Sequence, residues 1–168
     1  MVVIVIPGIL AAVAAPKFMD LQSDAKAVSL KGLEAALKSF DEMVYAKAVM
    51  QGQEKLSWNN SSVDMGSDVP VSTWYGHIDP YDAFFELLDK PVNECSMYCV
   101  YNADWIGIRY DDEGDYRVAH YCIRDAGIDP APENVRTAYS NLCQNCRITH
   151  KVNKNKSEVI ISSEISGC

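Results

Sequence analysis

The first sixteen residues of the chain carry no charged side chain. Residues 2–15 form an apolar run in which the most polar residue is Gly8. As a helix with a rise of about 1.5 Å per residue, this run spans about 21 Å. A bilayer core is about 30 Å thick and needs about 20 residues, so the run is too short to cross it alone. No basic residue precedes the run, which argues against a secretory signal peptide. The pattern predicts that this segment is buried by something outside its own domain.

Apolar residues recur at spacings of three, four or five between residues 17 and 50, with Lys, Asp and Glu between them. This pattern predicts that the helix continues to a stop signal at Gly52 and packs one face on the rest of the chain. The predicted packing face consists of Phe18, Leu21, Ala25, Val28, Leu33, Leu37, Phe40, Val44 and Ala48. A single helix over residues 1–50 is roughly 70 Å long, so its first half is expected to project. Pro7, Gly8 and Pro16 predict a kink or loosening within it.

The remaining residues, 51–168, are expected to form a globular head. Residues 51–94 are rich in Asn, Ser, Asp and Gly and predict a connecting loop with one helical insert at 80–89, capped by Asp79. The side chains of this insert expected in the core are Tyr81, Phe84, Phe85 and Leu88. From residue 95 the hydrophobic period becomes two, which predicts a small antiparallel sheet. The expected strands are 97–101, 105–110, 116–122, 147–152 and 158–162, with turns at 111–115 and 153–156 and a short helix at 133–142.

All cysteines lie from residue 95 onward. They are Cys95, Cys99, Cys122, Cys143, Cys146 and Cys168. An even number in a loop-rich region favours three disulfides and an oxidising compartment, although the sequence does not select a pairing. The alternative is a zinc site formed by the 95/99 and 143/146 pairs, whose first spacing is unusual for zinc. Arg147 follows Cys146 where covalent haem attachment requires His, so that motif is absent.

Charge narrows the possible partners. The chain has 15 basic and 23 acidic residues, for a net charge of −8, and is 48% hydrophobic. This composition excludes a disordered chain, and the length of 168 residues fits one domain. Residues 17–50 are balanced in charge, so the acidity belongs to the head. Without a Lys/Arg block, nucleic acid is not an expected partner.

The sequence contains no recognisable catalytic or cofactor motif. His77, His120 and His150 fall in different predicted elements, and no hydrolase, metalloprotease or nucleotide-binding pattern occurs. We therefore expect no enzyme, no cofactor and no metal. The acidic residues 111–115 offer carboxylates for calcium, but they do not follow the EF-hand spacing and favour a solvated hairpin turn. Asn59 and Asn60 are formal glycosylation acceptors.

The apolar run resembles the N-terminal helix of type IV pilins. Residues 2–18 read VVIVIPGILAAVAAPKF, in which the spacing from Gly-Ile-Leu-Ala-Ala to Pro is specific to that superfamily. Ala-Ala-Pro-Lys-Phe followed by Asp20-Leu21-Gln22 is most similar to the mannose-sensitive haemagglutinin group. The resemblance covers residues 2–50, and the remaining residues agree with the family only in the expected order of loop, antiparallel sheet and disulfide-bounded C-terminal region. It implies an α+β type IV pilin fold, in which a long helix with a protruding apolar half packs on a small antiparallel sheet with disulfide-stapled loops.

The resemblance implies a structural subunit that polymerises into an extracellular filament for adhesion, surface attachment or motility. The residues implied in the filament core, and in the inner membrane before assembly, are Val2, Val3, Ile4, Val5, Ile6, Ile9, Leu10 and Val13. The implied partners are further copies of the chain, the inner-membrane assembly machinery and a prepilin peptidase, and the surface receptor is not specified. In assembled pili of this family, the segment matching residues 8–16 is often unwound. Pro7 departs from the aliphatic residue that is usual there.

Other departures concern the start of the chain. Family members have a basic leader, an N-methylated Phe after the cleavage site and a Glu shortly after it, and none of these precedes the run. We expect Met1 to be an internal methionine of a longer chain, whose upstream residues extend the run to the length that a bilayer requires. The alternatives are a pseudopilin of a type II secretion system, a membrane-tethered extracellular domain that does not polymerise, and an enzyme.

Overall fold

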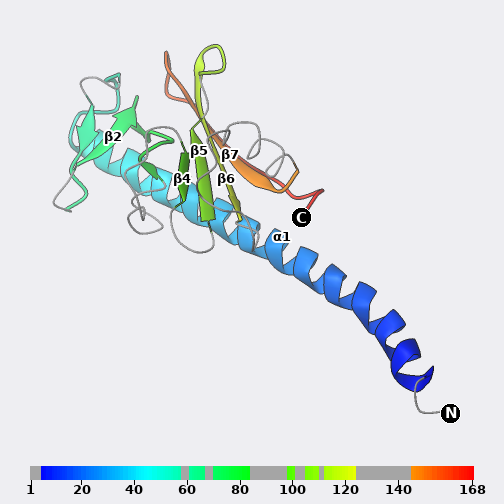
Figure 1. The fold of residues 1–168 in the computed structure, drawn as a ribbon. Coiled ribbons are helices and arrows are strands. Elements are labelled where there is room, and N and C mark those ends of the chain that lie inside the picture. Colours follow the sequence, from blue (N-terminus) through cyan, green and yellow to red (C-terminus); the bar gives the residue numbers. More distant parts are fainter. Residues whose placement is uncertain are drawn as a thin grey trace.

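The structure, a computed structural model, describes residues 5–57, 61–66, 70–83, 98–100, 105–109, 112–123 and 145–168. Within these ranges it describes the side chains except those of residues 5–20, 98–100, 108 and 109. Two layers make up the described fold, namely one long helix and the antiparallel strands packed on its C-terminal half (Figure 1). The chain is therefore an α+β protein.

Helix α1 (Val5–Met50) has 46 residues and is about 69 Å long at 1.5 Å per residue. It is helical throughout Pro7, Gly8 and Pro16, so the loosening predicted at these residues does not interrupt it in the single subunit. Figure 1 shows its N-terminal half extending beyond the strands. Gly52 ends the helix as predicted, with φ +68°. The amides of Gly52 and Gln53 bond back to the carbonyls of Val49 and Ala48 in a Schellman motif.

A small three-stranded sheet follows the helix where the sequence predicted a connecting loop. It consists of β1 (Ser62–Val63), β2 (Val71–Trp74) and β3 (His77–Ile78), paired antiparallel in the order β1-β2-β3. Tyr75 and Gly76 join β2 to β3 with φ values of +48° and +87°, the positive pair typical of a type I′ turn. A Cβ on Gly76 would lie 2.8 Å from the ring of Tyr45, so this turn is pressed against α1.

A five-stranded antiparallel sheet forms the larger part of the head. Its strands are β4 (Tyr98–Val100), β5 (Trp105–Arg109), β6 (Tyr116–Ile123), β7 (Arg147–Asn153) and β8 (Val159–Glu164), in the order β4-β5-β6-β7-β8. Each matches a predicted strand, with ends that differ by at most two residues. The turn at 153–156 is also confirmed, since β7 pairs directly with β8.

The predicted helical insert is only partly within the described residues. The hydrogen bond expected of Asp79 at the start of this insert is present, because its Oδ1 accepts from the amide of Tyr81 at 2.9 Å. Tyr81 is partly buried against the core. Phe84, Phe85 and Leu88 lie outside the described residues, as does the helix predicted at 133–142.

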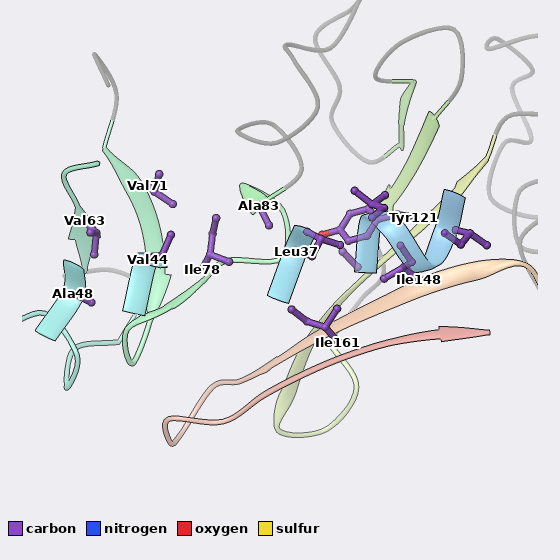
Figure 2. Close-up of a cluster of buried hydrophobic side chains, with 13 residues drawn as sticks. Leu37, Val44, Ala48, Val63, Val71, Ile78, Ala83, Tyr121, Ile148 and Ile161 are labelled. Atoms are coloured by element: carbon purple, nitrogen blue, oxygen red, sulfur yellow. The ribbon is translucent and has the colours of Figure 1, made fainter. Parts of the chain in front are cut away.

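The core lies between α1 and both sheets. Figure 2 shows Val44 and Ala48 of α1 near Val63, Val71 and Ile78 of the small sheet. Farther along the helix, Leu37 lies near Tyr121 and Ile148, which belong to the central strands of the large sheet. Since side chains alternate along a strand, β6 and β7 present residues 119, 121, 148 and 150 on the same face. One continuous helix face thus holds the two sheets together.

Candidate functional site

The helix face that packs on the head differs from the predicted one in its first half. Leu33, Leu37, Val44 and Ala48 are buried, and Phe40 packs against them partly buried. The prediction is wrong for three others, because Leu21 is 64% exposed, Val28 is 69% exposed and Ala25 is exposed. The side chain of Phe18 lies outside those described.

The cause is the step of five residues between Val28 and Leu33. At 3.6 residues per turn, five residues rotate the position by about 140° beyond a full turn, so the two halves of the pattern lie on different faces. Leu30, which is fully buried, packs on the head in this part of the helix in place of Val28. Nine residues are two and a half turns, so Leu21 and Val28 lie opposite Leu30 and Leu37, respectively. The helix therefore has two apolar faces, of which the head covers one.

The uncovered face continues toward the end of the helix. Met43 is 52% exposed and Met50 is 81% exposed, and both lie within about 60° of Val28 around the helix axis. We call Leu21, Val28, Met43 and Met50 the outer stripe. Val28 and Met43 are about 22 Å apart along the helix, so the outer stripe consists of two pairs of exposed apolar side chains on the same side of α1. Exposed apolar side chains that gather on one side of a molecule often mark a contact surface. The outer stripe is therefore a candidate contact surface.

The residues implied in a filament core lie in and just before the first turns of α1. Val5, Ile6, Ile9, Leu10 and Val13 belong to the helix backbone. Val2, Val3 and Ile4 lie outside the described residues, and the structure describes none of these side chains. In the described part of the chain, no helix combines the length and apolar character needed to span a membrane.

The cysteines within the described side chains are disulfide-bonded. Cys146 and Cys168 form one bridge, with their Cα atoms 4.8 Å apart, and Cys122 takes part in another. This agrees with the predicted disulfides and removes Cys146 from the alternative zinc site. The side chains of Cys95, Cys99 and Cys143 lie outside those described. Among the described residues, no group of three or more side chains could hold a metal ion.

The acidic turn before β6 is held by side chains of the β7–β8 hairpin. Lys154 Nζ lies 3.0 Å from an Asp112 carboxylate oxygen, and Lys151 lies 2.5 Å from Glu113. The side-chain amide of Asn155 donates to Asp115 at 2.9 Å. Hydrogen bonding to Lys151 lowers the pKa of Glu113. These partners occupy the carboxylates that the calcium alternative required, whereas Asp111 lies outside the described residues.

A buried ion pair connects the two sheets. Asp79 is 1% exposed, and Arg117 of β6 places its Nε 3.1 Å from the carboxylate of Asp79. The indole nitrogen of Trp74 donates to the same carboxylate at 2.9 Å. The guanidinium carbon of Arg117 lies 4.1 Å from the centre of the Tyr81 ring. Burial raises the pKa of Asp79, and the charge of Arg117 opposes this effect.

Two of the three histidines lie in the interior, in neutral form. Burial lowers the pKa of His150 to about 4, and its Nε2 has no hydrogen-bond partner among the described residues. Burial also lowers the pKa of His120 to about 4, and the nearby Arg147 adds to the effect. His120 lies on the face of the large sheet opposite to α1, where its Nδ1 is 2.9 Å from Thr149 Oγ1. The charges of Asp41 and His77 also act on His150, in opposite directions.

The third histidine, in contrast, lies between an acid and a hydroxyl. His77 Nδ1 is 2.8 Å from Asp41 Oδ2, and His77 Nε2 is 3.1 Å from Ser157 Oγ. The sequence analysis missed this cluster because its members are 36 and 80 residues apart. One signal was present, since Asp41 interrupts the packing face of the helix between Leu37 and Val44. An acid at such a position requires a partner within the head.

No protein-family model, no curated protein and no solved structure matches the chain. Function is therefore inferred from the residues and their geometry.

Proposed function

We propose that the chain is the structural subunit of a type IV pilus, which polymerises through α1 into an extracellular filament. The observation that carries this proposal is the outer stripe, an apolar face on the side of the helix turned away from the head. A helix that packs on one domain needs a single apolar face. The second face is explained if another copy of the chain covers it.

The fold supports the same assignment. One long N-terminal helix packed on antiparallel strands, with a disulfide near the C-terminal end, is the arrangement that the pilin resemblance implies. The helix extends beyond the head at the end that carries the apolar run (Figure 1). We assign residues 2–16 to the filament core and residues 17–50 to the part that carries the head.

Polymerisation follows from the physical chemistry of these surfaces. Fully burying a Leu, Val or Met side chain contributes about 1.5–3 kcal/mol, so the outer stripe and the apolar run together favour association. Contacts between different patches of identical subunits produce a helical filament when the rotation does not close into a ring. Before assembly, the inner membrane is the apolar environment for the same run. The partners are then other copies, the assembly machinery and a prepilin peptidase.

The experiment that tests this function is electron microscopy of filaments sheared from the source cells, with mass spectrometry of their subunit. The variant Val28→Glu places a charge on the outer stripe, at a side chain that is 69% exposed and therefore not needed for the head to fold. Ser162→Glu adds the same charge at an exposed position of β8 and serves as the control.

We expect filaments with the wild-type chain and with Ser162→Glu, and none with Val28→Glu, although all three should unfold at the same temperature. If the wild-type chain occurs only in membrane fractions and never in filaments, the proposal is wrong and a tethered domain or a pseudopilin is favoured. If Val28→Glu still forms filaments, the outer stripe is not the contact surface.

A further inference from the structure

We propose that Asp41, His77 and Ser157 form a site at which Ser157 accepts an acyl group from an activated ester or thioester. This inference concerns the contact between α1 and the head and does not depend on filament formation. The three residues come from α1, β3 and the turn between β7 and β8. Their order of contacts is carboxylate, imidazole and hydroxyl, the arrangement by which a base activates a serine for acyl transfer.

Asp41 sets the protonation pattern of the imidazole. It is 3% exposed, and its Oδ1 accepts a hydrogen bond from the amide of Ile78 at 3.0 Å. Its Oδ2 lies 2.8 Å from His77 Nδ1, and because a carboxylate only accepts, Nδ1 must carry the proton. In the neutral ring, Nε2 is then the acceptor, and the hydroxyl of Ser157 donates to it over 3.1 Å. Nε2 is thus the base that faces the nucleophile.

The surrounding structure fixes the imidazole in this orientation. The Tyr45 ring stacks on His77, with centroids 4.8 Å apart and an angle of 20° between the planes. His77 follows directly after the type I′ turn, whose Gly76 contacts the same Tyr45 ring. The side chain of His77 is 14% exposed, whereas Ser157 is exposed on its turn. The base is therefore held in place while the nucleophile remains accessible from solvent.

The chemical step balances without a further reactant. Ser157 Oγ attacks the carbonyl carbon of the donor and forms a new C–O bond, while its proton passes to His77 Nε2. The bond from the carbonyl carbon to the leaving oxygen or sulfur then breaks, and His77 returns the proton to the leaving group. Asp41 stabilises the imidazolium in between and acts as a positioning residue. The product is an ester on Ser157 and a free alcohol, phenol or thiol.

The test uses p-nitrophenyl acetate as the probe, with peptide mapping by mass spectrometry to locate the acetyl group. Ser39 and Ser162 are exposed serines of the same molecule and serve as internal references that do not depend on any variant. A positioned general base contributes a factor of about 10²–10⁴, so we expect Ser157 to be acetylated at least about 100-fold faster than the references. His77→Gln, which has no basic nitrogen, should reduce Ser157 to the reference rate, and circular dichroism verifies its fold.

Asp41→Asn tests the positioning role. The Asn carbonyl still accepts from the Ile78 amide, but its NH₂ group faces Nδ1 and forces the proton onto Nε2. We expect ¹⁵N NMR of His77 to show the change of tautomer and the acetylation of Ser157 to fall to the reference rate. Acetylation of Ser157 no faster than that of Ser162 in the wild-type chain, or a rate unaffected by His77→Gln, would overturn the proposal. The three residues would then only tether the β7–β8 turn to the helix.

Discussion

Replacing Arg117 by Met breaks the ion pair between the two sheets and leaves Asp79 as an unpaired buried carboxylate. Removing one partner of a buried pair costs about 3–5 kcal/mol. The side chains of Arg117 and Asp79 are only 12% and 2% exposed, so solvent does not replace the lost partner. The sulfur of Met retains part of the contact with Tyr81, worth about 0.3–1.5 kcal/mol. We expect the free energy of unfolding at pH 7 to fall by about 3–4 kcal/mol.

The penalty should shrink in acid. Burial already raises the pKa of Asp79, and without Arg117 the pKa rises further. The folded variant then takes up a proton at a higher pH than the unfolded chain, whose Asp pKa is about 3.9. As the pH falls from the raised pKa toward that value, the variant regains about 1.4 kcal/mol per pH unit. Its stability relative to wild type is therefore lowest at neutral pH.

Urea denaturation followed by far-UV circular dichroism, at pH 7 and at pH 4.5, measures both effects. The double variant Asp79→Asn/Arg117→Met is the matched control, because Asn keeps the hydrogen bond from the Tyr81 amide but carries no charge. The double variant should be more stable than Arg117→Met at pH 7. The difference in free energy of unfolding between the two variants should be smaller at pH 4.5. The reasoning is refuted if the penalty of Arg117→Met is the same at both pH values or if the double variant is no more stable.

Three further predictions concern the core and the disulfide. Burial lowers the pKa of His150 from 6.5 to about 4, so only the unfolded chain takes up its proton in that window and wild type loses stability as the pH falls from 6.5. Over the same pH range, the free energy of unfolding of His150→Gln should fall by about 1.4 kcal/mol per pH unit less than that of wild type. Urea denaturation at pH 6.5 and 4.5 measures this difference. An equal dependence of stability on pH in both proteins would contradict the lowered pKa of His150. Leu37→Ala should cost about 2–5 kcal/mol and Leu21→Ala less than about 0.5 kcal/mol in the same assay, and similar costs would show that both side chains pack on the head. Replacing Cys146 and Cys168 together by Ser opens a loop of 22 residues and should cost about 3 kcal/mol under non-reducing conditions, whereas an unchanged midpoint would mean that the bridge adds no stability.

The large sheet was predictable because its strands follow local rules. Alternating apolar residues mark β5, β6 and β7, and polar turns follow β5 and β7. The small sheet was missed because β1 and β3 have two residues each, too few to show a period. Its type I′ turn was hidden as well, because Tyr75 occupies a positive-φ position where Asn, Asp or Gly is usual.

The candidate site required distances that a linear pattern does not contain. Helical spacing identified Leu37 and Val44 as core residues, but one five-residue step placed Leu21 and Val28 on the wrong face. The partnership of Asp41 with His77 depends on how β3 crosses α1, a tertiary contact between elements with no shared period. Sequence rules describe a single element, whereas this cluster exists only where three elements meet.

The order of strands in the large sheet has a consequence for how the chain folds. Because β4 to β8 pair in sequence order, each strand needs only its predecessor, and the sheet can form through local steps as the chain is synthesised. The helix is the opposite case, since Glu34 bonds to Ser163 across a separation of 129 residues. Helix α1 precedes every strand in the chain, yet it acquires its last partners only when β8 is complete, and until then the part of its face that contacts the large sheet is not fully covered.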